Sequence, residues 1–236
     1  MIQYDYLKPL YSIHVPKCAG SSFTRVLRRW FRFRLHFHYH DERRDRPPKR
    51  ARMQSLRGGP RKGMCVHGHF NEDRGEGVFD YYPDAEQLIT ILRDPFDAHV
   101  SNYFYVRRKH VSQQGTFEAG ALHPIIENDW SLDDYLKHSP TSFYPLFLPD
   151  MSPAACHEIM ANRFLYVGVT EHLQLTIDRL AEILDKPAVS VPVENESAWG
   201  EPVPAGARER FYADNPVATA AYDYALKSNG LQPRAG

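Results

Sequence analysis

Apolar segments followed by amphipathic segments recur along most of the chain. The first apolar segment, LYSIHV at residues 10–15, ends at Pro16 and leads into a turn rich in small residues. Beyond the turn, apolar side chains recur at the spacing of one helix face: Phe23, Val26, Leu27, Trp30 and Phe31. This pattern predicts a strand, a loop and a helix, with Ser21 or Ser22 placed to cap the helix.

The same order recurs in the segment QLITILRDPFDAHVSNYFYVRR, residues 87–108. The apolar run 88–92 predicts a strand that ends at Arg93, Asp94 is placed to cap a helix, and Pro95 suits its first position. The helix would bury one stripe of side chains: Phe96, Val100, Tyr103 and Phe104. The pattern also allows a simpler interpretation, in which Arg93 and Asp94 form a surface ion pair at a capped helix start.

A further strand and helix are predicted at residues 164–184. The strand is 164–169, Thr170 is placed as the helix cap, and the helix face is formed by Leu173, Ile177, Leu180 and Leu184. Alternating or apolar runs at 33–40 and 63–70 predict two more strands, and SLDDYLKHS, residues 131–139, predicts a short helix. The aromatic and proline-rich section 110–160 is expected to wrap the site.

Repeated strand-then-helix units predict an α/β fold with a central parallel sheet flanked by helices on both faces. Ligands of such sheets bind at the carboxyl ends of the strands. Residues 14–22 and 93–101 both fall at such ends. We therefore expect them to face the same site.

Composition favours one globular domain over residues 1–236, since 42% of the 236 residues are hydrophobic and 13% are aromatic. The chain contains no apolar run of the ~18 residues that cross a bilayer, and its first residues lack the order of a secretory signal. We expect a soluble, cytoplasmic protein with no membrane partner. The three cysteines, Cys18, Cys65 and Cys156, match neither a zinc site nor a disulfide framework and are interpreted as reduced thiols.

Charge is balanced overall, with 29 basic and 29 acidic residues, but it is unevenly distributed. Residues 25–62 hold fourteen Lys or Arg against three acids. The stretch 41–63, rich in Arg, Pro and Gly, is predicted to be a mobile basic insertion, an anion-binding surface, or both. No nucleic-acid-binding module is recognisable, so nucleic acid is not an expected partner.

The turn HVPKCAGSSFTR, residues 14–25, has the composition of an anion cradle. Backbone N–H groups converge at a helix N-terminus and the helix dipole favours negative charge there. Lys17 adds a positive charge, and Ser21 and Ser22 add hydroxyl donors. The lysine precedes the glycine, unlike the order G-x-x-x-x-G-K-[ST] of nucleotide-triphosphate loops, which weakens a kinase or ATPase interpretation.

Three segments resemble one family. PKCAGSSFT, residues 16–24, resembles the 5′-phosphosulfate-binding loop of sulfotransferases that use 3′-phosphoadenosine 5′-phosphosulfate (PAPS), especially the carbohydrate group that includes heparan sulfate uronyl 2-O-sulfotransferase. RDPFDAHVSNYF, residues 93–104, is similar to the family's 3′-phosphate-binding segment. VGVTEHLQLTIDRL, residues 167–180, is similar to its late strand and helix, and the similarity spans roughly residues 10–185.

The resemblance implies a P-loop-like three-layer fold, PAPS as co-substrate, adenosine 3′,5′-bisphosphate (PAP) as product, and no required metal. Lys17 would contact the bridging and 5′-phosphate oxygens, and Arg93 with Ser101 would clamp the 3′-phosphate. The implied donor-binding residues are Lys17, Cys18, Ala19, Gly20, Ser21, Ser22, Arg93 and Ser101.

Transfer of a sulfuryl group to a hydroxyl needs a base, and histidine is suited to that role near neutral pH. In VHGHF, residues 66–70, the spacing of His67 and His69 places both on one face of an extended segment, and Gly68 permits close approach of a ligand or another backbone. The resembled enzymes carry a similar His-Gly-His segment with the second histidine as base. This implies His69 as the base and His67 in support, although the residues alone leave open which of the two acts.

Other titratable residues are less favoured. Glu72 and Asp73 follow His69 closely and remain acid–base alternatives. His36, His38 and His40 alternate on one face, but their arginine-rich neighbourhood predicts a surface location.

The sequence departs from the family at two positions and in one segment. Cys18 stands where a Thr is common, and Ala98 stands where the resembled enzyme has an Arg. A membrane anchor and luminal stem are also lacking, so a soluble bacterial relative fits better, and its acceptor need not be a glycosaminoglycan. We predict a hydroxyl-bearing acceptor, most plausibly a carbohydrate, with an anionic or sugar-like group docking near 41–62; the sequence does not predict the oligomeric state.

Two rival classes of function remain open. CAGSSFTR is similar to the loop of cysteine phosphatases, but six residues separate Cys18 from Arg25 where that loop has five, which would rotate the arginine away from the anion. A non-catalytic nucleotide- or polyanion-binding module would use the basic stretch 25–62 and would bind with a steep dependence on salt.

Overall fold

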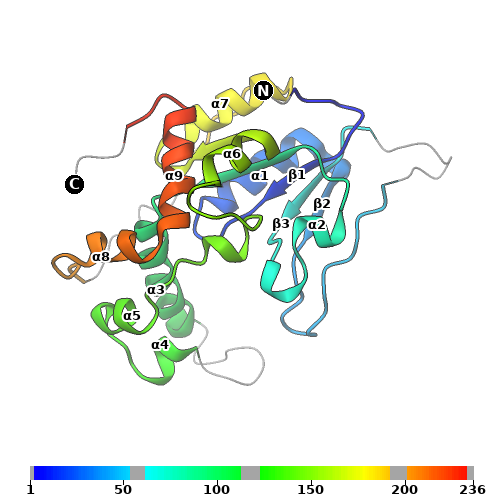
Figure 1. Cartoon of the computed structure of the whole chain (residues 1–236). Helices are drawn as coiled ribbons and strands as arrows, with labels where there is room; N and C mark the ends of the chain where they lie inside the picture. The colour runs from blue at the N-terminus through cyan, green and yellow to red at the C-terminus, as the bar shows by residue number, and fades with distance from the viewer. Residues whose placement is uncertain (1–2, 54–61, 113–122, 192–200, 233–236) are drawn as a thin grey trace.

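Five parallel strands form one sheet at the centre of the protein (Figure 1). This computed structural model describes residues 3–53, 62–112, 123–191 and 201–232. The strand order is β2-β3-β1-β4-β5. The strands are β1 (Leu10–Ile13), β2 (Leu35–His38), β3 (Cys65–Gly68), β4 (Leu88–Leu92) and β5 (Phe164–Val169).

Helices cover both faces of the sheet. The helices α1 (Gly20–Phe31) and α7 (Leu173–Ile183) pack on one face, where Phe23 and Ile177 share a buried cluster with Leu10 of β1. The opposite face carries α2 (Val78–Tyr81), α6 (Cys156–Arg163) and α9 (Pro216–Ser228). In Figure 1, α6 and α9 lie on the near side of the sheet and α1 on the far side. The predicted three-layer α/β fold with a central parallel sheet is confirmed.

A third group of helices extends from the end of β4. It comprises α3 (Pro95–Ser112), α4 (Pro124–Glu127), α5 (Leu132–His138) and α8 (Ala207–Asp214). Their apolar side chains form a separate buried cluster that includes Phe96, Tyr135 and Phe211. Figure 1 shows this group at the lower left, beside the sheet. The predicted short helix of residues 131–139 is α5, and Ser131 caps it as its side chain accepts the Asp134 N–H.

Two predicted helix starts are wrong. Helix α1 begins at Gly20, and its N-cap is Ala19, so Ser21 and Ser22 lie inside the first turn and cap nothing. The left-handed conformation of Ala19 starts the helix earlier than side-chain capping would. Thr170 is also not the cap of α7, because a 3₁₀ turn over Thr170–His172 (η4) intervenes and His172 is the N-cap.

Strand β1 lies between β3 and β4, and this order determines which residues flank the loop that follows β1. Ile13 pairs with Gly68 of β3 and with Thr90 of β4. The loop after β1 is therefore flanked by His69 on one side and by Arg93 on the other. Gly68 allows the close approach that its position predicts, because a Cβ there would lie 1.8 Å from the backbone carbonyl oxygen of His38.

Part of the basic insertion predicted at 41–63 is described. Asp41 forms a β-bridge with Arg46, and the backbone N–H of Ala51 donates to the Tyr82 hydroxyl across 2.9 Å. Residues 54–61 lie outside the described residues, so the mobility of the insertion stays a prediction. Across the described ranges, no helix combines the length and the apolar character needed to span a bilayer.

Candidate functional site

The loop between β1 and α1 has an unusual backbone. Lys17 and Ala19 both have positive φ, at 64° and 55°, although neither is glycine. Such residues cost about 1–3 kcal/mol each and cluster at functional sites. Alternation of right- and left-handed residues also turns successive N–H groups toward one concavity, the arrangement that binds anions. The loop therefore has the backbone geometry expected of an anion cradle at the start of α1.

Gly20 is required by a histidine that packs over the loop. A Cβ added at Gly20 would lie 1.7 Å from Nε2 of His14 and 2.1 Å from its Cε1. The imidazole of His14 thus occupies the space beside the first residue of α1. Gly20 is explained by this contact, since its φ is not positive.

Three cationic side chains converge near the loop. The ammonium of Lys17 lies 4.0 Å from the ring centroid of Tyr105 on α3. Burial, and then the charges of Arg108 and Arg93, lower the pKa of Lys17 to about 8. No ion pair among the described residues includes any of these three cations. Cations that form no close ion pair, beside converging N–H groups, suit a ligand with several negative charges.

Tyr144 connects the loop after β1 to the end of β4. Its hydroxyl accepts the backbone N–H of Arg93 at 3.0 Å and donates to the carbonyl of the same residue. The Sγ atom of Cys18 lies 3.4 Å from the same hydroxyl. Tyr144 is fully buried. One phenol therefore fixes the relative positions of two segments that the sequence predicted to share a site. The expectation that the section 110–160 wraps the site stays a prediction.

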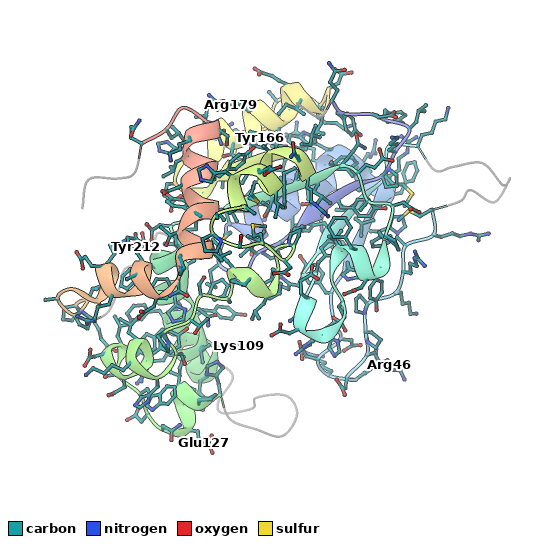
Figure 2. All side chains as sticks on the ribbon, viewed as in Figure 1. Arg46, Lys109, Glu127, Tyr166, Arg179 and Tyr212 are labelled. Atoms are coloured by element: carbon teal, nitrogen blue, oxygen red, sulfur yellow. The ribbon has the colours of Figure 1, made fainter. Side chains whose placement is uncertain are left out.

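Asp94 caps α3, because its Oδ1 accepts the N–H of Asp97 at 3.0 Å. Its ion-pair partner is Arg208 of α8, at 3.1 Å, and Arg208 also reaches Asp97 at 2.6 Å. The Tyr212 hydroxyl donates to Asp94 Oδ2 at 2.5 Å, and Figure 2 labels Tyr212 on this helix. The expected alternative of a surface ion pair between Arg93 and Asp94 is wrong, since the ion-pair partner of Asp94 is Arg208 and Arg93 forms no ion pair with it.

His69 has the geometry of a general base. Its Nδ1–H donates to the backbone carbonyl of His14 at 2.6 Å, which assigns the proton of the neutral ring to Nδ1 and leaves the lone pair on Nε2. Burial lowers the pKa of His69. The ring is therefore neutral at pH 7 and ready to accept a proton at Nε2.

His67 is held on both sides within the protein. Its Nδ1 lies 2.9 Å from Ser12 Oγ and its Nε2 lies 3.1 Å from Thr24 Oγ1. Burial lowers the pKa of His67 to about 3. Since both ring nitrogens have partners, His67 supports the site rather than exchanging protons with a ligand.

His14 links the two other histidines. Its ring stacks on His69 at 4.4 Å and on His67 at 5.3 Å between centroids. Its Nδ1 is 2.9 Å from the hydroxyl of Tyr39, and burial lowers its pKa well below the usual value. Both His67 and His69 thus contact one ring, in agreement with their predicted common face.

The remaining predicted residues lie in different surroundings. Ser21 is exposed, whereas Ser22 is buried at the wall of a cavity of about 210 Å³. That cavity is lined by Ser22, Arg25, Val26, Arg29, Val189, Ser190 and Val191. Ser101 is buried on α3, with 2% of its surface exposed. Whether these hydroxyls contact a ligand stays a prediction.

The alternative acid–base residues are placed less favourably than His69. The carboxylate of Glu72 lies at the start of α2, where a Cβ added at Gly77 would be 2.2 Å from its Oε2. Burial raises the pKa of Glu72 to about 7, and Asp73 is exposed. The raised pKa suits Glu72 to general-base work, so Glu72 stays an alternative, whereas the hydrogen bond that fixes the ring of His69 favours His69.

The surface location predicted for His36, His38 and His40 is wrong for His38. This ring is completely buried, stacks on Phe70 at 4.3 Å, and donates from Nε2 to the carbonyl of Glu76. The edge strand β2 turns it toward the α2 side of the sheet. Over the described part of the chain, no group of three or more His, Cys, Asp or Glu side chains is arranged to hold a metal ion.

The thiol of Cys18 points into the protein core. It is 2% exposed and its pKa is raised to about 12 by burial. Only the backbone of Cys18 is therefore available to a ligand in the loop. A protonated, buried thiol is a poor nucleophile.

Four contributors to this site were not predicted from the sequence: His14, Tyr105, Arg108 and Tyr144. Of these four residues, only His14 could have been found from the sequence, because it lies at the carboxyl end of an apolar strand, where ligands of parallel sheets bind. The other three become neighbours of the loop only through tertiary packing.

Fold and site together define a three-layer α/β protein with a cation-lined loop after its first strand. No protein-family model matches the sequence, and no curated protein sequence matches it. Among solved structures, the chain is similar to a crystal structure of a sulfotransferase from Alicyclobacillus acidocaldarius, with 15% identity and a TM-score of 0.45 over 96% of this chain and 97% of that chain. A similarity this loose carries no argument about activity.

Proposed function

We propose that this protein is a PAPS-dependent sulfotransferase that transfers a sulfuryl group to an acceptor hydroxyl. The observation that carries the proposal is the joint placement of Lys17, Arg93 and Arg108 near a helix N-terminus, beside a neutral histidine with an available Nε2. The phosphosulfate and the 3′-phosphate of the donor would supply the negative charges that pair with these cations. The motifs at residues 16–24 and 93–104 support the same donor.

The donor would be held by the loop and by the end of β4. Lys17 would contact the bridging and 5′-phosphate oxygens, the backbone of residues 18–22 would surround the phosphosulfate, and Arg93 with Ser101 would hold the 3′-phosphate. The cavity beside Ser22 adjoins the same helix start and is a candidate location for the adenine base.

In the transfer step, His69 Nε2 would take the proton of the acceptor hydroxyl as its oxygen attacks sulfur in line. The new bond joins the acceptor oxygen to sulfur, and the bond from sulfur to the bridging phosphate oxygen breaks, so PAP leaves with the electron pair. Lys17 would stabilise the charge that develops on that bridging oxygen. Positioning and charge stabilisation carry most of the catalysis, by analogy with phosphoryl transfer.

The acceptor we propose is a carbohydrate hydroxyl, with an anionic or sugar-like group docked near residues 41–62. The basic stretch 25–62 motivates this choice. Deleting residues 54–61 and measuring acceptor KM at several salt concentrations tests it. An unchanged KM at every ionic strength would exclude docking through that segment.

The central experiment is a screen of glycans, lipids and phenols with ³⁵S-labelled PAPS. The parent protein is compared with Lys17→Ala and His69→Ala, each checked for folding by circular dichroism. We expect transfer by the parent alone. Equal transfer by both variants would remove the proposed roles, and binding of PAP without transfer to any acceptor would favour a nucleotide-binding module.

The cysteine phosphatase alternative is disfavoured by the burial of Cys18 and its raised pKa. A polyanion-binding module remains the main competitor. It predicts binding that weakens steeply with salt and is indifferent to His69.

A further inference from the structure

Lys17 does not extend freely into solvent but meets the side of α3. Its ammonium lies 4.0 Å from the ring centroid of Tyr105. Tyr105 is 44% exposed, so the ring forms part of the surface rather than the core. A cation over an exposed aromatic face gains about 0.5–1 kcal/mol, enough to favour one side-chain position.

Further charges surround this contact. Arg108 follows Tyr105 by three residues on α3, which places both on one face of the helix. Arg93 approaches from the end of β4, and Arg108 and Arg93 both repel the ammonium. The other titratable groups near Lys17 are the thiol of Cys18 and the imidazole of His14. Both groups are buried and neutral at pH 7.

We propose that Tyr105 is a positioning residue that holds the Lys17 ammonium at the mouth of the loop, and that Tyr105 and Arg108 oppose each other in setting the charge of Lys17. Anion binding by the loop is then controlled by pH just above neutrality. The identity of the anion rests on the proposed function, but the positioning of Lys17 does not.

The signs of the two effects are opposite. The ring of Tyr105 favours the protonated amine and so raises the pKa of Lys17, whereas Arg108 lowers it. With a pKa of about 8, Lys17 is mostly charged at pH 7 and mostly neutral at pH 9. A bound anion favours the charged form, so binding above pH 8 is accompanied by proton uptake.

The first test measures Lys17 itself, without any ligand. The rate of acetylation of Lys17 by trace acetic anhydride is followed from pH 6 to 10 by peptide mass spectrometry in the parent, Tyr105→Leu, Tyr105→Phe and Arg108→Gln. We expect the midpoint to fall by about half a pH unit in Tyr105→Leu, since 1.36 kcal/mol corresponds to about one unit. It should rise in Arg108→Gln and stay unchanged in Tyr105→Phe, which keeps an aromatic face.

Equal acetylation midpoints in the parent and Tyr105→Leu would overturn the positioning role of Tyr105. A lower midpoint in Arg108→Gln than in the parent would overturn the proposal that Arg108 disfavours the charged form of Lys17. The exposed Tyr105 is replaced without opening a cavity, and thermal unfolding of each variant confirms that the comparison is made on folded protein. Lys186, which lies 5.1 Å from the ring of Phe31, provides an internal control lysine that should be acetylated at the same rate in the parent and in every variant.

The second test measures affinity for PAP by titration calorimetry at pH 7 and 9, in buffers of different ionisation enthalpy. We expect tighter binding at pH 7, proton uptake at pH 8.5, and about threefold weaker binding by Tyr105→Leu at pH 8. Absence of PAP binding by the parent would refute the proposed donor, while the acetylation profile still decides the role of Tyr105. Binding that is equally tight at both pH values would refute the control by pH.

Discussion

The imidazole of His69 donates its Nδ1 proton to the backbone carbonyl of His14, 2.6 Å away. Because that carbonyl belongs to the first residue after β1, the base and the cation-lined loop are positioned by the same segment of chain. Stacking of the two rings at 4.4 Å strengthens the arrangement. The orientation of the base therefore depends on the backbone of the loop that would hold the donor.

Replacing His69 by Ala should lower the rate of transfer by about 10²–10⁴-fold, because no histidine would then take the proton from the acceptor hydroxyl. Affinity for PAP should change little, since in the proposed reaction His69 Nε2 contacts the acceptor hydroxyl and not the nucleotide. Turnover with labelled PAPS and calorimetry with PAP measure the two effects separately. His157→Ala, on the exposed side of α6, is the matched control. A rate loss shared by both variants would contradict the assignment.

The dependence of the rate on pH should reflect the same residue. Burial lowers the pKa of His69 below its ordinary value, so the neutral base is already fully formed at pH 7. On the acid side, we expect the rate to fall below about pH 6.5 and to lose this acid limb in His69→Ala. If the rate of the parent still rose steeply between pH 7 and 8, the base would be a group other than His69.

Gly20→Ala should weaken PAP binding by about tenfold or more, because the added methyl would overlap the imidazole of His14. Overpacking of this kind costs about 1–3 kcal/mol and would displace the loop. The double variant Gly20→Ala, His14→Ala removes the overlapping ring and should recover part of the affinity. No recovery in this double-mutant cycle would mean that Gly20 serves another purpose.

Tyr144→Phe should loosen the connection between the loop and β4. Losing the hydroxyl leaves the Arg93 backbone without its partner, and we expect about 1–3 kcal/mol less stability together with weaker PAP binding. Tyr166→Phe is a matched control, because it also removes a buried hydrogen bond, to Asn229 at 2.8 Å. Figure 2 labels Tyr166 beside Arg179, away from α8.

Urea unfolding and PAP titration should separate these two tyrosine variants. Both should lose stability, and only Tyr144→Phe should lose affinity. A similar affinity loss in Tyr166→Phe would show that general destabilisation, and not the connection through Tyr144, weakens the site.

Stability should decrease on acidification because buried histidines must be protonated. The folded pKa of His67 is lowered to about 3 and the unfolded value is near 6.5, so its contribution is complete above pH 6.5 and is lost as pH falls toward 3. Each such group contributes a slope of about 1.4 kcal/mol per pH unit within that window. Urea midpoints at pH 7 and 5 should show a smaller decrease in His67→Asn than in the parent; an equal decrease would exclude His67 as a source.

The sequence predicted all five strands of the described sheet, but it placed the bounds correctly only where residues with strong local preferences end the strand; the runs 10–15, 33–40 and 63–70 are longer than β1, β2 and β3. The bounds 88–92 and 164–169 match β4 and β5, since apolar strands there end at Arg93 and Thr170. Gly68 was correctly linked to a close approach, because only a glycine leaves room for the His38 carbonyl. Local pattern and tertiary structure agree at these positions.

The sequence failed where tertiary contacts override local preference. Serine capping was predicted for α1, but the left-handed Ala19 starts the helix without it. Tyr105, which contacts Lys17, lies 88 positions (105 − 17) further along the chain, and a periodic pattern marks it only as one more helix residue. The shared location of residues 14–22 and 93–101 could therefore be predicted from the sequence, whereas the residues that orient these segments could not.

The hydroxyl of Tyr144 joins two segments that are made at different times. The loop of residues 14–22 leaves the ribosome early, but the phenol that joins Cys18 to Arg93 is translated more than a hundred residues later. Domains are completed as their segments emerge. A nascent chain that stops short of this tyrosine carries residues 14–22 and 93–101 and yet lacks the hydroxyl that joins them, so the two segments are connected only after residue 144 has been made.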